Sequence, residues 1–159
     1  MSPKDKSSNR YILSMGVELL DFEELSKIYG KDIQNEYIVI KFHGQSFVYH
    51  QIRKMVGALI QSFQEDCDDS IIVNSFCLNK IPIWLAPGEG LLLDKLNYSS
   101  FNTRKDIPEI IELNEEEEAK RVEFKKTNIL KSVLEYEEKD KVFTQWLIEL
   151  NEDKKESHY

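Results

Sequence analysis

The alternation of apolar and polar residues predicts two β-strands in the first third of the chain. Residues 10–20 (RYILSMGVELL) have the β-branched and aromatic content of a strand, and residues 37–43 (YIVIKFH) alternate more regularly. Successive side chains of a strand point to opposite faces, so the second strand divides into two sets. One face carries Ile38, Ile40 and Phe42, and the other carries Tyr37, Val39, Lys41 and His43. The polar residues 21–36 between the strands include an expected turn at 29–32.

A helical period replaces this alternation after Gly44. Six apolar residues follow the i, i+3, i+4, i+7 rule, namely Ile52, Met55, Val56, Leu59, Ile60 and Phe63. They predict a helix from Ser46 or Phe47 to Gln64 that packs this stripe against the sheet. At 100° per residue, Arg53 lies about 90° from the centre of the stripe, at the boundary between core and solvent, with Tyr49 on its core side.

Gly57 lies inside this predicted helix, where glycine is about 1 kcal/mol less favourable than alanine. One explanation is that another segment must approach the helix closely at this position. The other is an ordinary packing contact of the helix, and the sequence leaves both open.

The second half of the chain predicts a loop, one strand and three helices. An acidic turn at 66–69, with Asp69 or Ser70 as N-cap, precedes a short helix over 71–78. Two prolines and two glycines make residues 81–90 a loop, and residues 90–98 are apolar enough for a central strand. A charged helix is expected from Glu115 to about Leu134. A final helix should bury Trp146 and Phe143, whose stripe also includes Leu147 and Leu150.

The chain has 159 residues, 41% hydrophobic and 31% charged, with a net charge of -8. This is enough for one globular domain. The charge is unevenly distributed, because residues 37–64 contain three basic and no acidic groups, whereas residues 106–159 contain nine basic and sixteen acidic groups. An anionic partner would meet the least repulsion at 37–64. A buried strand and helix with no room for solvated carboxylates explain the same pattern.

Several classes of protein and site are disfavoured. No apolar run approaches the roughly 20 residues of a membrane span, and the polar residues 1–9 lack the apolar core of a secretory signal, so they are expected to be a flexible lead-in. Cys67 and Cys77 form no CxxC pair and are interpreted as core residues, and we expect no metal. No glycine-rich phosphate loop opens a helix and no G-x-S-x-G is present, so neither a nucleotide cofactor nor a serine hydrolase is expected.

The block from Phe42 to Gly57, FHGQSFVYHQIRKMVG, concentrates the remaining candidate chemistry. Amide, imidazole and guanidinium groups follow one another closely where a strand end, a glycine turn and a helix meet. These groups are typical of sites that contact phosphates and base edges. The residue types alone support either an RNA-facing site or a structural corner between strand and helix.

This block closely resembles the G-Q-S-F-x-x-H-Q-I-R-K-M-x-G stretch of TruA-type tRNA pseudouridine synthases, in particular their eukaryotic multisite branch. Residues 82–93 (PIWLAPGEGLLL) resemble the family's P-x-A-P-G-x-G-L-x-L segment with a spacing difference of one residue, and residues 101–104 (FNTR) are similar to its Y-N-x-R. The region 135–146 is similar to the C-terminal helix of that branch. The resemblance extends over about residues 10–150.

The resemblance implies an α+β fold in which helices flank a mixed, mainly antiparallel sheet, with RNA held in a cleft between two halves. It also implies a cofactor-independent isomerisation of uridine to pseudouridine in tRNA, carried out by an aspartate in a G-R-T-D-x-G-V motif. This chain does not contain that motif. We therefore expect residues 10–150 to be the C-terminal domain of a longer enzyme, inactive alone, with residues 151–159 as a polar tail and an N-terminal catalytic-aspartate domain as its missing partner.

The family motif assigns one catalytic role and a set of binding roles. Arg53 matches the helix arginine that pairs with the catalytic aspartate, and Gly90 and Leu91 match the apolar wall of the uridine pocket. A guanidinium suits this role because it forms two parallel charge-assisted hydrogen bonds with a carboxylate. The structural alternative for Arg53 is a surface ion pair. Residue type and placement alone suggest further RNA contacts by Lys41, His43, Gln45, His50, Lys54 and Arg104.

A second interpretation is a non-catalytic RNA-binding or assembly module that kept this scaffold, and a weaker third is an acidic adaptor for other proteins. The resemblance implies a nuclear protein, with a mitochondrial or cytoplasmic location left open, and no membrane association. The sequence does not indicate which uridines are modified or what the oligomeric state is.

Overall fold

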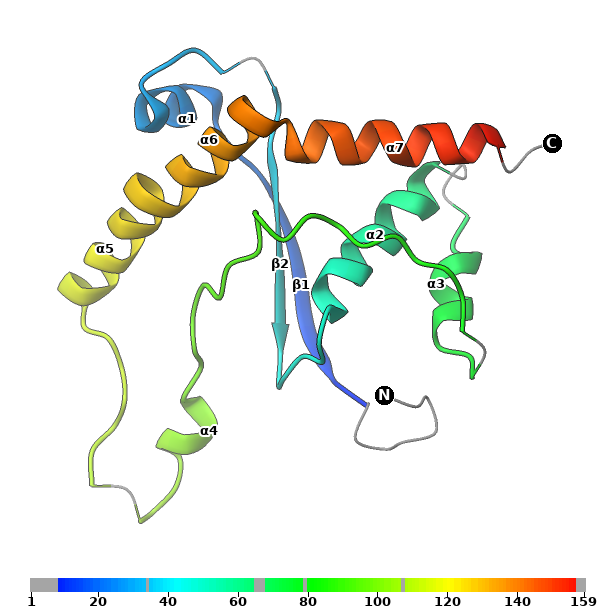
Figure 1. The fold of residues 1–159 in the computed structure, drawn as a ribbon. Coiled ribbons are helices and arrows are strands. Elements are labelled where there is room, and N and C mark those ends of the chain that lie inside the picture. Colours follow the sequence, from blue (N-terminus) through cyan, green and yellow to red (C-terminus); the bar gives the residue numbers. More distant parts are fainter. Residues whose placement is uncertain (1–8, 34, 65–67, 79, 107, 157–159) are drawn as a thin grey trace.

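The computed structural model describes residues 9–33, 35–64, 68–78, 80–106 and 108–156. A two-stranded antiparallel sheet lies in the middle of the molecule, with helices around it (Figure 1). The strands are β1 (Ile12–Leu19) and β2 (Ile38–Gly44). The helices are α1 (Phe22–Tyr29), α2 (Gln51–Gln64), α3 (Ser70–Ser75), α4 (Ser99–Asn102), α5 (Glu115–Phe124), the π-helix η2 (Lys125–Leu130), α6 (Lys131–Asp140) and α7 (Val142–Glu156).

The pairing of β1 with β2 confirms both predicted strands and the division of β2 into two faces. Val17 is opposite Ile40 and Met15 is opposite Phe42, which places the apolar residues of both strands on one face. Gly16 is opposite Lys41 and Ser14 is opposite His43, so Lys41 and His43 lie on the other face. An irregularity in the register lies between Ile12 and Ser14. The expectation of a larger mixed sheet is not met, because the described residues form only these two strands.

Helix α1 replaces part of the polar connection expected between the strands. The Asp21 carboxylate accepts a hydrogen bond of 2.9 Å from the Glu24 amide and begins the helix. Gly30, with φ 78°, ends it in the left-handed conformation that glycine adopts without strain. Leu25 is only 2% exposed and anchors the helix. A single buried leucine among polar residues is too weak a periodic signal to predict such a short helix.

Helix α2 begins at Gln51, four or five residues after the predicted start. His50 has φ 64°, a left-handed conformation that an α-helix cannot continue through. The Gln51 side chain accepts a hydrogen bond of 2.9 Å from the Val48 amide and fixes the turn before the helix. The predicted end at Gln64 is correct, and the Gln64 side chain donates a hydrogen bond of 2.9 Å to Asn151 of α7.

The predicted strand over 90–98 is wrong, because these residues follow an irregular path. Leu91 is 51% exposed and Leu93 is 73% exposed. A central strand needs backbone partners on both sides, and the described residues offer none to this segment. Its attachment is instead electrostatic, since Asp94 pairs with Arg121 and Lys125 at 2.9 Å each.

The charged helix continues further than predicted, as α5, η2 and α6 form one helical run from Glu115 to Asp140. Asn114 and Glu117 form a capping box at its start. Lys141, with φ 53°, turns the chain into α7. Glu137 is 3% exposed, and its carboxylate accepts a hydrogen bond of 2.8 Å from the Phe143 amide, so it caps α7. Helix α7 extends to Glu156, beyond the expected start of the tail.

The hydrophobic core is small. Among the described residues, the buried apolar side chains are Leu25, Ala58, Ala86, Leu134 and Leu150. Phe143 and Trp146 are half-buried rather than fully buried. Cys77 is exposed, so its interpretation as a core residue is wrong, and Cys67 lies outside the described residues. None of the described helices combines the length and the apolar character that a membrane crossing needs.

Candidate functional site

Arg53 lies half-buried on the first turn of α2 and is joined to the loop over 81–90 by two hydrogen bonds. Its Nε donates to the Ala86 carbonyl oxygen at 2.5 Å, and the Ala86 amide donates to the Arg53 carbonyl oxygen at 3.3 Å. Arg53 and the loop are thus joined through both the amide and the carbonyl group of Ala86, a residue that is only 5% exposed. The hydrogen bond at Nε restrains the orientation of the Arg53 guanidinium.

Gly57 explains how the loop comes this close to α2. A Cβ placed on Gly57 would lie 1.9 Å from the Trp84 carbonyl oxygen, well inside van der Waals contact. One turn later, the Gln61 side chain accepts a hydrogen bond of 3.0 Å from the Trp84 amide. Of the two explanations for Gly57, the structure supports the close approach of another segment. The loop backbone runs along the α2 surface from Gln61 back to Arg53.

Gly88, in the same loop, also lies beside the Arg53 guanidinium. A Cβ placed on Gly88 would be 3.4 Å from Nη1 of Arg53, an ordinary van der Waals separation. Among the described residues no carboxylate pairs with Arg53, and its only side-chain hydrogen bond is the one from Nε to Ala86. An arginine presents five donors, so the two terminal nitrogens keep their capacity to bind an anion. Within this part of the chain, the surface ion pair considered for Arg53 is therefore not found.

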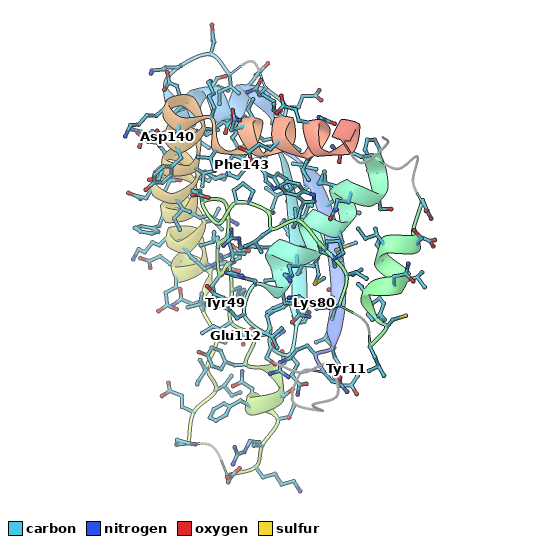
Figure 2. All side chains as sticks on the ribbon, turned by 45° about the vertical axis from the view of Figure 1, so that its right-hand side comes forward. Tyr11, Tyr49, Lys80, Glu112, Asp140 and Phe143 are labelled. Atoms are coloured by element: carbon cyan, nitrogen blue, oxygen red, sulfur yellow. The ribbon has the colours of Figure 1, made fainter. Side chains whose placement is uncertain are left out.

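Gly90 and Leu91 follow directly in the same loop. The Leu91 amide donates a hydrogen bond of 3.0 Å to the Gly88 carbonyl oxygen, which closes a tight turn. A Cβ on Gly90 would lie 3.1 Å from the ring of Phe143, so this turn packs against the first turn of α7, where Figure 2 labels Phe143. The structure therefore places Gly90 and Leu91 in the same loop as the residues that hold Arg53.

The predicted RNA contacts from β2 lie on one face but differ in their pairing. Lys41 and His43 are both exposed on the polar face of the sheet. Lys41 forms an ion pair with Glu18 on β1, which raises the pKa of Lys41 and lowers that of Glu18. Gln45 is exposed just after the strand, and its amide donates to the Tyr11 carbonyl oxygen at 3.2 Å. The Lys41 ammonium group is thus already paired within the sheet.

The remaining predicted contacts lie in two separate places. His50 immediately precedes α2, and its carbonyl oxygen accepts a hydrogen bond of 2.9 Å from the amide of the exposed Lys54. Arg104 follows α4 and binds Asp106 through two hydrogen bonds of 3.2 and 2.9 Å. The Arg104 guanidinium holds the pKa of the Asp106 carboxyl below its usual range. The structure brings His50 and Lys54 to the end of α2 that carries Arg53, whereas no described contact connects Arg104 to that helix.

Two features of the site were missed by the sequence reasoning. The first is the pair of main-chain hydrogen bonds between Ala86 and Arg53, for which the sequence contains no signal, because backbone groups carry no residue identity. The second is the exposure of Tyr49: helical periodicity put this residue on the core side of Arg53, but α2 begins only after it, and Tyr49 is 88% exposed and stacks on His50. An aromatic residue beside a histidine at the start of a helix was a usable signal. No cluster of three or more His, Cys, Asp or Glu suited to a metal occurs in the described part of the chain.

A family model described as tRNA pseudouridine synthase matches residues 2–99, which is more than half of the chain. The chain belongs to this family of synthases. The match contains the β1–β2 sheet, α2 and the loop that holds Arg53.

Curated relatives of the family extend the match. The chain is 32% identical over 147 residues to the human Pseudouridylate synthase 1 homolog, covering 91% of this chain and 32% of that protein. It is 35% identical over 145 residues to tRNA pseudouridine synthase 1 of Candida albicans, covering 88% of this chain and 22% of that protein. The Saccharomyces cerevisiae tRNA pseudouridine synthase 1 matches at 42% identity over 73 residues, 46% of this chain and 13% of that protein. The chain thus spans about a third or less of the length of these relatives and corresponds to their C-terminal part.

Proposed function

We propose that this chain is the C-terminal domain of a tRNA pseudouridine synthase, and that Arg53 is the cation that orients and keeps ionised the catalytic aspartate of a polypeptide outside this chain. The observation that carries the proposal is the state of Arg53. Its Nε is bound to Ala86, while no described carboxylate pairs with its terminal nitrogens. Anchoring at Nε leaves Nη1 and Nη2 as a fork that binds both oxygens of one carboxylate.

The proposed reaction is an isomerisation of uridine in tRNA, so no atom is gained or lost overall. The bond between N1 of uracil and C1′ of the ribose breaks, and a bond between C5 and C1′ forms. The proton that C5 loses is balanced by the proton that N1 gains. An aspartate that is ionised and correctly oriented is needed for this chemistry, and a nearby permanent cation favours the ionised form. Arg53 supplies that cation, and Leu91 contributes an apolar wall to the uridine pocket.

Binding of the tRNA is assigned to the polar face of the sheet and to the start of α2. Residues 37–64 contain no carboxylate, and Glu18, which β1 contributes to the polar face, is paired with Lys41, so a polyanion meets little unpaired negative charge from the sheet. The contacts proposed for this surface are Lys41, His43, Gln45, His50 and Lys54, with Arg104 as a more distant one. Because the whole chain has a net charge of -8, the RNA must be bound through this local surface rather than through overall charge.

The apolar face of the sheet supports a missing polypeptide as the partner. On β1, Met15, Val17 and Leu19 are 57%, 63% and 61% exposed, and they share a face with Ile38, which is 56% exposed. Apolar patches of this extent mark interaction sites in soluble proteins. Since the chain spans about a third of the human relative, the remaining two thirds of such an enzyme provide ample polypeptide to cover this face.

The second candidate is a non-catalytic RNA-binding or assembly module, and one observation favours it. The 159 residues contain no G-R-T-D sequence, so they carry no aspartate in the family's catalytic motif. The two candidates differ in whether another polypeptide brings that aspartate to Arg53.

The test is an assay of tritium release from tRNA labelled at C5 of uridine. We expect no release by the 159 residues alone. We expect release by the complete product of the gene, purified with any subunit that accompanies it. Full activity of the isolated chain would contradict the missing-aspartate proposal. Absence of activity from the complete product, together with retained tRNA binding, would establish the non-catalytic candidate instead.

A further inference from the structure

Tyr49 and His50 form a two-ring platform at the start of α2. The ring centroids lie 3.6 Å apart with an interplanar angle of 26°, so the rings are stacked. Tyr49 is 88% exposed, the highest value among the exposed large hydrophobic side chains of the described residues. One face of the phenol ring is therefore covered by the imidazole, and most of the rest of the ring is open to solvent.

The backbone fixes the direction of this pair. His50 has φ 64°, and a non-glycine residue in this region is strained by about 1 kcal/mol or more. The conformation is maintained from both sides, because the Gln51 side chain binds the Val48 amide and the His50 carbonyl oxygen binds the Lys54 amide. The two rings are thus presented from a turn that is held at both ends, and not from a loose side chain.

The surrounding charges indicate which flat ligand this platform fits. Arg53 and Lys54 lie on the first turn of α2, directly after the platform, and Lys54 is exposed, whereas Lys41 is already paired with Glu18 of β1. Residues 37–64 contribute no carboxylate. Among the described residues, Lys54 forms no ion pair with an acidic group. A ligand with planar rings on an anionic backbone fits this environment, which disfavours the arginine side chains of a basic peptide. Nucleobases in single-stranded RNA have this combination of properties.

We propose that Tyr49, supported by His50, is a stacking platform for one unpaired nucleobase of the bound RNA. The inference rests on the RNA-binding surface of the proposed function and adds a contact with a base to contacts with phosphates. It requires no catalytic aspartate, and the isolated chain can therefore test it. Base stacking accepts any of the four bases, so the platform holds an unpaired nucleotide without selecting its identity.

The experiment measures the affinity of the 159-residue chain for a fluorescein-labelled octamer of uridylate at fixed ionic strength. Tyr49→Ala should weaken binding by about 5- to 150-fold, the range for loss of one base–aromatic stack. Tyr49→Phe keeps a ring and should bind within about twofold of the native chain. The matched control is Phe76→Ala, which removes a ring that is 86% exposed but belongs to the C-cap of α3, and it should leave the affinity unchanged.

Two further arms separate stacking from other causes. Against an octamer of abasic sugar-phosphates, the native chain and Tyr49→Ala should bind equally, and the salt dependence should be the same because no charge is removed. His50→Gly accepts the left-handed backbone and removes only the imidazole, so it should weaken binding to oligouridylate less than Tyr49→Ala does.

The proposal is overturned if Tyr49→Ala binds oligouridylate as tightly as the native chain, if the abasic octamer shows the same loss as the uridylate, or if the native chain does not bind the octamer at all. Binding of a proline- or arginine-rich peptide at Tyr49, with no effect of the variant on RNA, would assign the platform to a protein partner instead. None of these outcomes bears on tritium release by the complete gene product, so the stacking platform and the role of Arg53 fail or survive separately.

Discussion

Gly57 determines how closely the loop over 81–90 can approach α2. The Trp84 carbonyl oxygen occupies the space that a side chain at this position would need. Ala86 follows two residues later and receives the Nε hydrogen bond of Arg53 at 2.5 Å. Because Gly57 has no Cβ, the loop comes close enough to α2 for the Ala86 carbonyl oxygen to accept the hydrogen bond of the Arg53 guanidinium.

Gly57→Ala should lower the free energy of unfolding by about 1–3 kcal/mol, the usual range for forcing extra volume into a packed contact. A Cβ lying 1.9 Å from a carbonyl oxygen requires the loop or the helix to move. Urea denaturation followed by circular dichroism measures the change. Gly16→Ala is the matched control, because no atom lies within 4 Å of its added Cβ, and it should change stability by less than about 0.5 kcal/mol. Equal stability of the two variants would contradict the close contact.

The position of Arg53 was predictable, and its hydrogen bonds were not. Helical periodicity placed Arg53 at the boundary of the apolar stripe, and it is half-buried as that position requires. Its partner is a main-chain oxygen of Ala86, 33 residues further along the chain. No pattern of side chains records which distant backbone group an arginine will reach. Whether Arg53 acts on an aspartate also stays a prediction until the complete enzyme is assayed.

An ion-pair cluster connects the irregular segment 91–98 to the helical run that begins with α5. Asp94 pairs with Arg121 and Lys125 at 2.9 Å, and Glu118 pairs with Arg121 at 2.7 Å and with Lys95 at 3.4 Å. Arg121 and Lys125 are four residues apart, so both reach Asp94 from one side of the helix. These ion pairs attach the segment to the helical run in place of the backbone hydrogen bonds that a neighbouring strand would provide.

The cluster should make this attachment sensitive to acid. The Arg121 guanidinium lowers the pKa of Glu118 from its ordinary 4.5 to about 2, and the Lys125 ammonium group contributes most to lowering the pKa of Asp94. A carboxyl whose pKa is lower when folded stabilises the fold above its ordinary pKa, and this stabilisation is lost as the pH falls through the folded value. The attachment should therefore weaken between about pH 4.5 and 2.

The amide resonances of residues 91–98, followed by NMR as the pH is lowered, test this expectation. Their shifts should move over that interval, and Glu118→Gln should remove the part of the change that comes from Glu118. Resonances that stay constant down to pH 2, or a Glu118→Gln profile identical to the native one, would show that the ion pairs do not hold the segment.

Among the secondary-structure elements, those with strong local periodicity were predicted correctly. Both strands and α2 formed where two-residue or 3.6-residue periods were clear, although α2 begins late because His50 adopts a left-handed backbone. The strand over 90–98 failed for a different reason. Its apolar residues indicated burial between neighbouring strands, and a strand forms only where another strand is present to pair with it. The sequence of a segment does not show whether a neighbouring strand will be present to pair with it.

The whole molecule combines a small core with a large apolar surface. Few apolar side chains of the described residues are fully buried, whereas Met15, Val17 and Leu19 of β1 are each more than half exposed. A hairpin alone is marginally stable, and it usually gains further strands or a covering layer. We therefore expect the aspartate-bearing polypeptide to cover this face in the complete enzyme.

Val17→Glu tests that expectation at the centre of the apolar face. Because Val17 is 63% exposed, the free energy of unfolding of the isolated chain should change by only about 0.5 kcal/mol or less. In the complete gene product, the same change should weaken association with the aspartate-bearing polypeptide or lower the melting temperature. Ser14→Glu, on the opposite face of β1, is the matched control and should not affect association. An unaffected complete enzyme with Val17→Glu would show that this face is free.

The single-turnover rate of tritium release by the complete gene product at saturating tRNA, measured with Arg53→Ala and Arg53→Lys, tests the role of Arg53. If Arg53 positions the catalytic aspartate, Arg53→Ala lowers the rate by about 100- to 1,000-fold, as expected for loss of one preorganised charged group, while the Kd for tRNA changes far less. Arg53→Lys should give an intermediate rate, because a lysine keeps the charge and loses the fork. A rate for Arg53→Ala equal to the native rate would contradict the assignment.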